Sequence, residues 1–448
     1  MDSFDNQAFL QTFSERLLSL TSSLSHTPNE SSPSNTTRNF LVAYSGGMDS
    51  HVLLHLLSDL SKQTVNVSVR ALHVHHGLLK EADAWGKHCQ SVCDGLGVSL
   101  EVIHLNLKVD RGESIEAVAR QGRYRVLSKA LQKGEILLTG HHQRDQAETL
   151  LLQLFRGAGV QGLAAMPAVA NFVKNSGKEY QHIRPLLTES YQSLKAYARD
   201  NLLNYIEDPS NQDNSFERNY LRNHILPQLR EHWQGIDKTI SRSASIQSET
   251  KILLDELAEE TMRAVKGDKK HTLSVNALLE LSVSRMKLVL RYWLTQQGFK
   301  APSEKKLSHI LSDVLLAKKD AQPLVQWQGV EVRRYKNQLY SLAPLPLHDN
   351  KQVISWDGRS PLVLESLGVT IPLTALNALD DLPVQKHPVT VRFRQGGERL
   401  FSRNKKHTQS LKNLLSDAEI VPWLRDRIPL IYAGDKLIHI IGLDLKLK

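Results

Sequence analysis

The segment that decides the fold is residues 40–50, which have the sequence FLVAYSGGMDS. Its first five residues are mostly apolar and typical of a buried strand, and the apolar residues of His51–Leu57 recur at helical spacing. The loop between them contains Gly46 and Gly47, which lack a Cβ and let the backbone approach a ligand closely. Because the first N–H groups of a helix have no partner within it, small polar residues here are suited to binding an anion such as phosphate.

This loop does not contain the Gly-x-x-x-x-Gly-Lys-Ser/Thr pattern, so no Walker-type lysine is expected at the phosphates. Its Ser-Gly-Gly-x-Asp-Ser run instead resembles the pyrophosphate-binding loop of the PP-loop ATPases. Members of that superfamily typically cleave ATP between the α- and β-phosphates and adenylate an oxygen of their substrate. The resemblance implies that ATP is held by six residues: Ser45, Gly46, Gly47, Met48, Asp49 and Ser50. An ordinary Gly-Gly turn with a Ser/Asp cap is the alternative.

The composition favours a multidomain protein with a polyanionic partner. A chain of 448 residues exceeds the size at which one core stops growing, so two or three domains are expected. Its apolar runs are far shorter than the roughly 20 residues of a membrane span, and the acidic N-terminal segment does not resemble a secretory signal. The two cysteines, Cys89 and Cys93, fit a reducing cytoplasm, and the net charge of +9 favours a polyanion.

Strand and helix patterns alternate after an N-terminal extension over residues 1–38, in which an amphipathic helix precedes a linker rich in Ser, Thr, Asn and Pro. Strands are expected at Phe40–Tyr44, Val65–Val74, Val98–Leu107 and Glu135–Thr139. Helices are expected at His51–Leu60, Glu81–Gly97, Ser114–Lys133 and Gln143–Arg156. This alternation predicts an α/β domain over residues 39–235, with a parallel sheet covered on both faces. Ligands of such sheets bind beyond the carboxyl ends of the strands.

Histidines are concentrated at two of these strand ends. They are His73, His75 and His76 after the second strand, and His141 and His142 after the fourth. No cysteine or carboxylate interleaves with the first group at a familiar metal-ligand spacing, so we favour contacts to phosphate or a base over a metal site.

A run of polar residues opens the helix that follows the fourth strand. If this run is helical, His141, Asp145 and Glu148 lie at i, i+4 and i+7 on one polar face. Two carboxylates near a phosphate loop are expected to require a cation between them, either Mg²⁺ or an amine substrate. A solvated helix face is the alternative. Arg120, on the preceding helix, offers a fixed charge and a fork of donors for phosphate oxygens.

These motifs together resemble the bacterial tRNA(Ile)-lysidine synthetases of the long, three-domain type, from about Phe40 to the C-terminus. The most specific are His-His-x-x-Asp-x-x-Glu-Thr at 141–149 and Arg-Gly-x-Gly-x-x-Gly-Leu at 156–163. Asp-Pro-Ser-Asn at 208–211 and Arg218-Asn219 with Arg222 occur in the order of the same family. Arg144 departs from its pattern, since many relatives carry Asp or Asn there.

The resemblance implies a Rossmann-like PP-loop catalytic domain of the adenine nucleotide α-hydrolase type. It also implies that ATP adenylates the C2 oxygen of the wobble cytidine in a CAU-anticodon isoleucine tRNA, and that free L-lysine then displaces AMP to give lysidine. Catalytic roles fall on Asp49, Arg120, His141, Asp145 and Glu148, with Asp145 and Glu148 binding the lysine ammonium. Asp49 would hold Mg²⁺ or brace the loop, and His141 or His142 would relay the proton of the amine.

The rest of the chain predicts two further domains. A mainly helical tRNA- or substrate-binding domain is expected at 236–345, and a small α+β domain with a hairpin turn at Gly434-Asp435 is expected at 355–448. Basic residues near aromatic ones in the last domain are typical of an RNA-binding surface. We expect tRNA contacts from Arg392, Arg394, Arg403, Lys405, Lys406 and Lys412.

Two other functions are weighed against the ligase. A PP-loop tRNA thiolase generally relies on catalytic cysteines or a Cys-ligated cluster, which this chain does not supply at a suitable position. A non-catalytic, ATP-regulated RNA-binding protein would not need Asp145 and Glu148 beside the loop. We therefore expect a cytoplasmic ligase that uses ATP and Mg²⁺ and does not associate with a membrane, and we leave a homodimer open.

Overall fold

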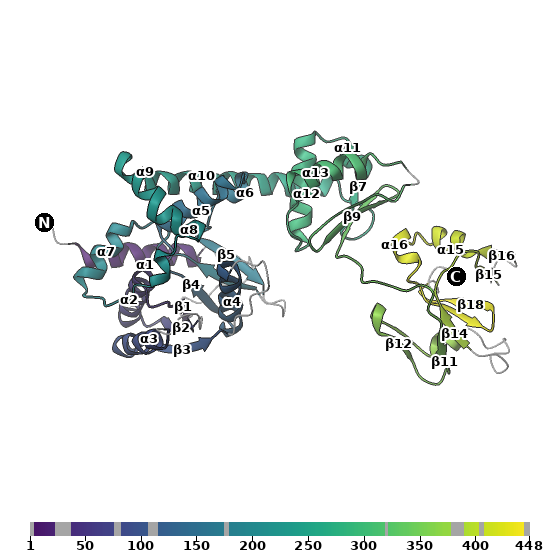
Figure 1. Cartoon of the computed structure of the whole chain (residues 1–448), viewed down its shortest axis with the longest axis horizontal. Coiled ribbons are helices and arrows are strands. Elements are labelled where there is room, and N and C mark those ends of the chain that lie inside the picture. The colour runs from purple at the N-terminus through teal and green to yellow at the C-terminus, as the bar shows by residue number, and fades with distance from the viewer. Residues whose placement is uncertain are drawn as a thin grey trace. The chain divides into compact units, whose positions relative to one another are not determined.

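The computed structural model describes residues 4–22, 37–75, 82–105, 115–173, 179–318, 321–377, 389–402 and 407–442. The chain divides into two compact units, Met1–Leu253 and Leu254–Lys448. Figure 1 labels many of their helices and strands. The finer division into domains at 39–235, 236–345 and 355–448 stays a prediction.

The first unit is built on a six-stranded sheet in the order β3-β2-β1-β4-β6-β5, in which β5 alone is antiparallel to its neighbour. The strands are β1 (Arg38–Ala43), β2 (Val67–His75), β3 (Ser99–His104), β4 (Glu135–Leu138), β5 (Val169–Val173) and β6 (Glu179–Ile183). The four strands expected from the sequence are confirmed. The β5–β6 hairpin is an addition that the sequence patterns did not predict.

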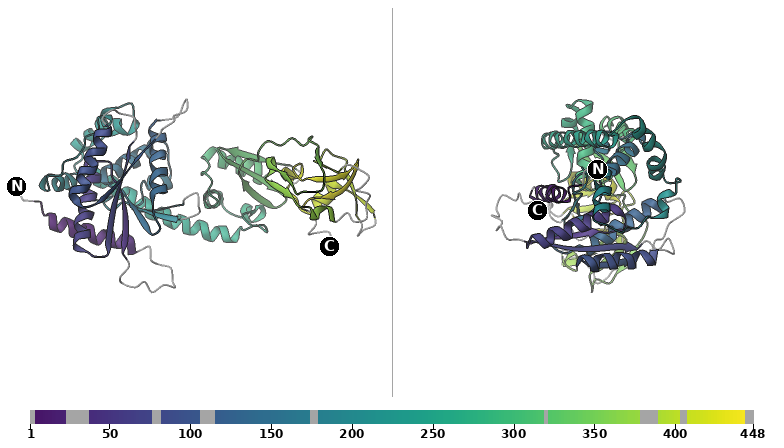
Figure 2. Two further views of the ribbon diagram at one scale, coloured as in Figure 1. Left: turned by 90° about the horizontal axis from the view of Figure 1, so that it is seen from below. Right: turned by 90° about the vertical axis from the view of Figure 1, so that its left-hand side faces the viewer.

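Helices lie on both sides of this sheet, as Figures 1 and 2 show. One apolar cluster joins a face of the sheet to α1, α2, α3 and α7, and a second joins the other face to α4. These helices are α1 (Asn6–Ser22), α2 (Met48–Gln63), α3 (Ala82–Leu96), α4 (Ile115–Ala130) and α7 (Tyr191–Asp200). Because Phe13 and Leu17 of α1 are buried, part of the N-terminal extension belongs to the core of this unit.

The order in which the chain adds strands to the sheet changes direction between β1 and β4. The chain runs outward from β1 through β2 to β3, and then returns to place β4 on the other side of β1. Helix α2 begins after β1, and α5 (Gln143–Phe155) begins after β4, so both helices start at the same edge. Such a switch point is where parallel α/β sheets bind their ligands.

The chain then passes through a series of short helices near this edge. They are α6 (Val160–Leu163), η1 (Pro209–Gln212), α8 (Glu217–Tyr220), η2 (Leu221–Ile225) and α9 (Leu226–His232), before the long α10 (Ile236–Ala264). The Ile206 N–H donates to the Gly46 carbonyl at 2.9 Å. The segment that leads into these helices is therefore tied to the loop between β1 and α2.

The second unit begins with a four-stranded sheet in the order β7-β10-β9-β8, packed against helices. Its strands are β7 (Leu273–Ser274), β8 (Leu324–Trp327), β9 (Val330–Tyr335) and β10 (Gln338–Leu342). Its helices are α11 (Val275–Leu279), α12 (Val283–Gln296), α13 (Glu304–His309) and η3 (Ile310–Leu315). Ser303 caps α13 by accepting from the Lys306 N–H.

A second four-stranded sheet, β11-β14-β17-β18, organises the C-terminal part of this unit. The strands here are β11 (Ile354–Trp356), β12 (Leu362–Leu364), β13 (Val369–Ile371), β14 (Val389–Arg392), β15 (Arg399–Ser402), β16 (His407–Ser410), β17 (Leu430–Ala433) and β18 (Lys436–Ile440). The helices are η4 (Glu365–Leu367), α14 (Thr374–Asn377), α15 (Leu411–Asp417) and α16 (Pro422–Arg425). The expected hairpin at Gly434-Asp435 is present, with Gly434 at a φ of +61°. Among the described residues, no helix has the length and apolar character needed to cross a bilayer.

Candidate active site

The loop between β1 and α2 has the backbone shape of an anion cradle. Gly46 adopts a φ of +84°, and a Cβ there would come within 2.7 Å of the Ile206 side chain. Gly47 is the N-cap of α2, and none of the described side chains caps this helix. The backbone N–H groups at the positive N-terminal end of α2 are therefore available to a ligand.

The two serines of the loop brace it. The Ser50 hydroxyl donates to the Gly47 carbonyl at 3.0 Å and accepts from the Ser45 N–H at 3.2 Å. The two hydroxyl oxygens lie 2.9 Å apart, and Ser45 also accepts from the Gly47 N–H at 3.4 Å. Met48 contributes only its backbone to the cradle, because its side chain is buried in the core.

Asp49 points from the first turn of α2 toward the start of α5. Its Oδ2 lies 3.4 Å from Nε2 of His142. Its Oδ1 is buried and has no hydrogen-bond partner within the part of the chain that the structure describes. A buried carboxylate oxygen left in this way beside a phosphate cradle fits a ligand of Mg²⁺, which commonly uses one or two carboxylates together with phosphate oxygens.

Gly140 lets the two helix starts approach each other. A Cβ on Gly140 would lie 2.7 Å from the carbonyl oxygen of Asp49 and 2.9 Å from its carbonyl carbon. Only a residue without a Cβ fits this contact between two backbones. The phosphate loop and the beginning of α5 thus form one packed seam.

Helix α5 begins at Gln143, as expected from the sequence, and this start lies two residues after His141. His142 is its N-cap, accepting from the Arg144 N–H at 3.2 Å, while Asp145 accepts from the His142 N–H at 3.0 Å. His141 therefore precedes the helix, and the expectation that it shares a helical face with Asp145 and Glu148 is wrong in this respect. Because the His142 side chain accepts a first-turn N–H and Asp145 accepts the His142 N–H, this capping box fixes the start of α5 at Gln143 and leaves His141 outside the helix.

The acids of α5 face the protein interior, and its apolar end faces solvent. Asp145 is 8% exposed and Glu148 is 0% exposed, whereas Leu154 and Phe155 are 49% and 67% exposed. A solvated acidic face, the alternative considered from the sequence, is excluded by this burial. Two buried carboxylates need cationic or hydrogen-bonding partners.

Arg218 and Arg222, from α8 and η2, supply those partners. Arg218 donates from Nε to Glu148 at 2.7 Å and from Nη2 to Asp145 at 2.9 Å. Arg222 donates to Glu148 from Nε at 2.6 Å and from Nη2 at 2.8 Å. The expectation that Mg²⁺ or an amine must separate the two acids is thus incomplete, because the chain itself provides two guanidinium groups. Arg218 and Arg222 both belong to a motif noted in the sequence. Nothing in that motif indicates that they pair with acids some 70 positions earlier in the chain.

The charges around Asp145 and His142 shift their pKa values in opposite directions. Burial alone would raise the pKa of Asp145, but His142, Arg218, His141 and Arg222 hold it well below its usual range. Burial alone would lower the pKa of His142, but Asp49, Asp145 and Glu148 raise it above its usual value. Asp145 is therefore ionised at neutral pH and is a weak base.

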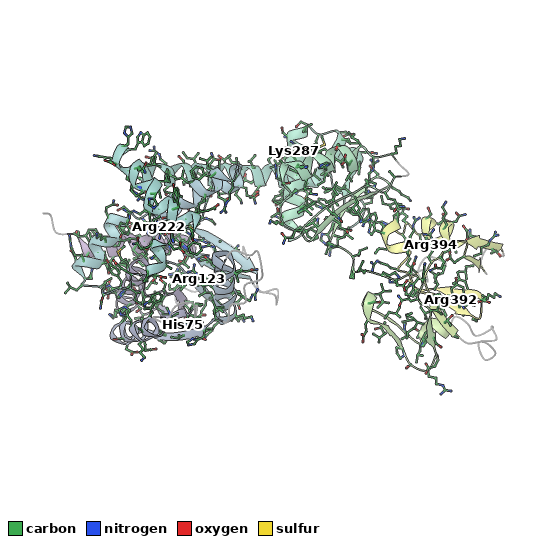
Figure 3. The ribbon with its side chains drawn as sticks, in the orientation of Figure 1. His75, Arg123, Arg222, Lys287, Arg392 and Arg394 are labelled. Carbon is green, nitrogen blue, oxygen red and sulfur yellow. The ribbon has the colours of Figure 1, made fainter. Side chains whose placement is uncertain are left out.

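Three arginines lie near Tyr124 of α4. The guanidinium groups of Arg120 and Arg123 lie 5.3 and 5.8 Å from the ring centroid of Tyr124. Burial, together with Arg120 and Arg218, lowers the pKa of Arg123. Arg184, which follows β6, is also buried, and its Nε has no hydrogen-bond partner among the described residues. Such a concentration of positive charge favours an anionic ligand. Figure 3 labels Arg123 and Arg222 in this unit.

The histidines of the two strand ends have different environments. His73 is buried beneath the loop, with Nδ1 3.0 Å from the Tyr44 carbonyl oxygen, so the expected contact with phosphate or a base is wrong for His73. His75 is buried at the end of β2, and His76 lies outside the described residues. Within the described ranges, no group of three His, Cys, Asp or Glu side chains is arranged to hold a metal ion.

The C-terminal basic residues are only partly free to contact RNA. Arg392 donates to the Gly434 carbonyl at 2.8 Å and stacks on Tyr432, and Arg394 pairs with Asp426 at 3.1 Å. Lys412 is exposed on α15. Arg403, Lys405 and Lys406 lie outside the described residues. Figure 3 shows Arg392 and Arg394 on the C-terminal part of the second unit.

The fold and the cradle place the first unit among PP-loop domains, and the family model described as a PP-loop domain matches residues 15–229. The models of the TilS substrate binding domain and the TilS substrate C-terminal domain match residues 273–340 and 389–446. The chain belongs to the tRNA(Ile)-lysidine synthase family.

Three relatives illustrate how much of the family sequence this chain shares. The tRNA(Ile)-lysidine synthase of Coxiella burnetii is 42% identical over 90% of this chain and 88% of the relative. The enzyme of that name from Methylococcus capsulatus is 39% identical, with 90% and 91% covered. The one from Photorhabdus laumondii is 38% identical, with 90% of each chain covered.

Proposed function

We propose that this protein ligates free L-lysine to C2 of the wobble cytidine in a CAU-anticodon isoleucine tRNA. ATP adenylates the C2 oxygen with release of pyrophosphate, and the ε-amine of lysine then displaces AMP, so that lysidine is formed. The observation that carries the proposal is the link from Asp49, at the phosphate cradle, through His142 to Asp145. This link supports the proposal because an anion cradle and a carboxylate suited to a cationic substrate would then lie at one sheet edge.

The cradle residues support the first half-reaction. Ser45, Gly46, Gly47, Met48, Asp49 and Ser50 surround the N-terminus of α2. We assign the pyrophosphate of ATP to this cradle, where backbone N–H groups stabilise the charge that develops as it leaves. Mg²⁺, when bound, would neutralise phosphate charge, and the unpaired Oδ1 of Asp49 is the atom suited to hold it. We assign Arg120 to an oxygen of the nucleotide or tRNA phosphates.

The buried acids support the second half-reaction. We assign the lysine ammonium to Asp145 and Glu148, although all of their oxygens already have partners in the chain. Each carboxylate has about four lone-pair positions, so a further donor can be accepted. Asp145 is the more accessible, with 12% of its side chain exposed against 0% for Glu148. Asp145 would therefore make the closer contact with the amine, while Glu148 adds negative charge beside it and holds the two arginines in place.

The test of this function is the complete reaction. Purified protein is incubated with CAU-anticodon tRNA, ATP and labelled lysine, and label in the tRNA is counted. We expect incorporation only when ATP is present, with one pyrophosphate released for each lysine. If folded protein that binds ATP leaves the tRNA unlabelled, the proposed function is wrong.

Replacing Asp145 with Asn should raise the apparent KM for lysine by about 10- to 100-fold, because a charge-assisted hydrogen bond is lost. The KM for ATP should change far less, since Asp145 is not part of the cradle. Steady-state kinetics with each substrate varied in turn give both values. An unchanged KM for lysine in both Asp145→Asn and Glu148→Gln would refute the assignment.

We further propose that the C-terminal basic residues bind tRNA. Replacing the exposed Lys412 with Gln should weaken tRNA binding, and the slope of log K against log salt should fall by about one, because one phosphate contact is lost. Lys62→Gln, at an exposed residue of α2, is the matched control and should leave both unchanged. Filter binding at several salt concentrations measures the slope, and an equal slope in all three proteins would count against Lys412.

Two further properties of the protein are its location in the cell and its oligomeric state. We propose that the protein works in the cytoplasm, in keeping with free thiols at Cys89 and Cys93. The sequence is compatible with a homodimer. Light scattering of the purified protein would measure its mass and distinguish a monomer from a dimer.

A further inference from the structure

A row of hydrogen bonds connects Arg184 to His141 through two intermediate side chains. Arg184 Nη2 lies 3.2 Å from Nδ1 of His182, and Nε2 of His182 lies 2.8 Å from the Thr139 hydroxyl. The same hydroxyl lies 2.7 Å from Nδ1 of His141. Thr139 follows β4, and His182 belongs to the neighbouring β6, so the row crosses two adjacent strands.

The row has a definite direction, because a guanidinium can only donate. Nδ1 of His182 must accept from Arg184, so a neutral His182 carries its proton on Nε2 and donates to Thr139. The Thr139 hydroxyl accepts this bond and donates its own proton to Nδ1 of His141, which is its other hydrogen-bond partner among the described side chains. A neutral His141 is thereby left with its proton on Nε2.

Both imidazoles are neutral at physiological pH. Burial and the neighbouring Arg184 lower the pKa of His182 to about 2. Burial lowers the pKa of His141 to about 3; Asp145 opposes this shift, and Arg184, Arg218 and Arg123 add to it. Thr139, His182 and Arg184 are themselves buried, so water does not compete for their hydrogen bonds.

We propose that Arg184, His182 and Thr139 are positioning residues that hold His141 as an Nε2–H donor toward a substrate oxygen. His141 then does not accept the proton of the attacking amine, because its Nδ1 is occupied. His142 is occupied as well, with Nδ1 at the Arg144 N–H and Nε2 beside Asp49. The direction of the hydrogen bonds follows from the structure alone, whereas the role toward a substrate oxygen rests on the proposed function.

The first measurement is the tautomer of His141 in the full chain. Histidine ring ¹⁵N labelling and a two-bond ¹H–¹⁵N correlation identify which nitrogen carries the proton, with His141→Asn used for the assignment. We expect the proton on Nε2. A proton on Nδ1 would overturn the proposal, and this readout holds whether or not the protein forms lysidine.

Kinetics of two His141 variants test the donor role. The amide nitrogen of Gln can approximate Nε2 of histidine, whereas the shorter Asn cannot reach that position, and neither side chain is a base. We expect His141→Asn to lower kcat/KM for lysidine formation by about 100-fold, and His141→Gln to retain about tenfold more activity than His141→Asn. Equal loss in both variants would overturn the proposal.

Variants of Thr139 test the positioning role. Thr139→Val keeps the branched shape but removes the hydroxyl, and we expect kcat/KM to fall by about 10- to 100-fold. Thr139→Ser should recover most of the loss. Thr21→Val removes a buried hydroxyl in α1 and is the matched control, expected to keep wild-type kinetics. Wild-type kinetics in Thr139→Val would overturn the proposal. If Thr139→Val does not fold, the kinetics of the His141 variants and the measured tautomer of His141 still test the proposal.

Discussion

Replacing Gly140 with Ala is expected to abolish most of the activity, although no charged residue is replaced. The added Cβ would lie 2.7 Å from the Asp49 carbonyl oxygen and 3.1 Å from the Ser50 N, which are backbone atoms that cannot rotate away. Closely packed interiors transmit such a clash as a displacement of whole segments. A shift of about 1 Å at reacting groups can cost about 100-fold in rate, so we expect a loss in kcat/KM of at least about that size.

The measurement is lysidine formation together with ATP affinity, because the shift should move both the cradle and α5. Gly95→Ala is the matched control, since a Cβ on Gly95 in α3 would meet nothing within 4 Å. Alanine is a better helix former than glycine, so this control should keep full activity and gain up to about 1 kcal/mol of stability. If Gly140→Ala kept the wild-type ATP affinity and the wild-type rate of lysidine formation, the prediction would be wrong, because the contact between the loop and α5 would then tolerate the added Cβ.

Replacing Glu148 with Ala should destabilise the protein more than any change at an exposed acid. Glu148 is fully buried and accepts three hydrogen bonds from Arg218 and Arg222, which would keep their charges without this partner. Removing one member of a buried ion pair typically costs about 3–5 kcal/mol, because the remaining charge stays desolvated. We expect a loss of about that size in the free energy of unfolding of the first unit.

Urea unfolding followed by circular dichroism measures this loss. Glu217→Ala is the matched control, since Glu217 pairs with Arg156 at the surface and such pairs contribute about 0–1 kcal/mol. Combining Glu148→Ala with Arg222→Met should cost less than the sum of the two single changes, because the second removes an unpaired charge. Equal unfolding midpoints for Glu148→Ala and Glu217→Ala would contradict the role of the buried cluster.

The strength of local periodicity explains which parts of the fold could be predicted from the sequence. The apolar run before Ser45 and the helical spacing after it are local signals, and the structure places β1 and α2 there. The strands Val169–Val173 and Glu179–Ile183 mix polar and apolar residues within five positions. Their pairing depends on the neighbouring sheet more than on their own pattern, so they were missed.

The site shows a similar division between local and long-range information. The cradle and the acids belong to short motifs, whereas the pairing of Glu148 with Arg218 and Arg222 joins positions about 70 residues apart. The position of His182 on β6 gives no local sign that it lies beside Thr139. The burial of Asp145 and the exposure of Phe155 also reverse what amphipathic patterning suggests, because partner charges at the site override it.

The contact of Gly140 with Asp49 also bears on how the two substrates meet. Since backbone packs directly against backbone at this place, the distance from the phosphate cradle to Asp145 is set by the scaffold itself. On the proposed function, the wobble base of the tRNA would then enter a site in which the separation of the phosphate cradle and Asp145 is already fixed.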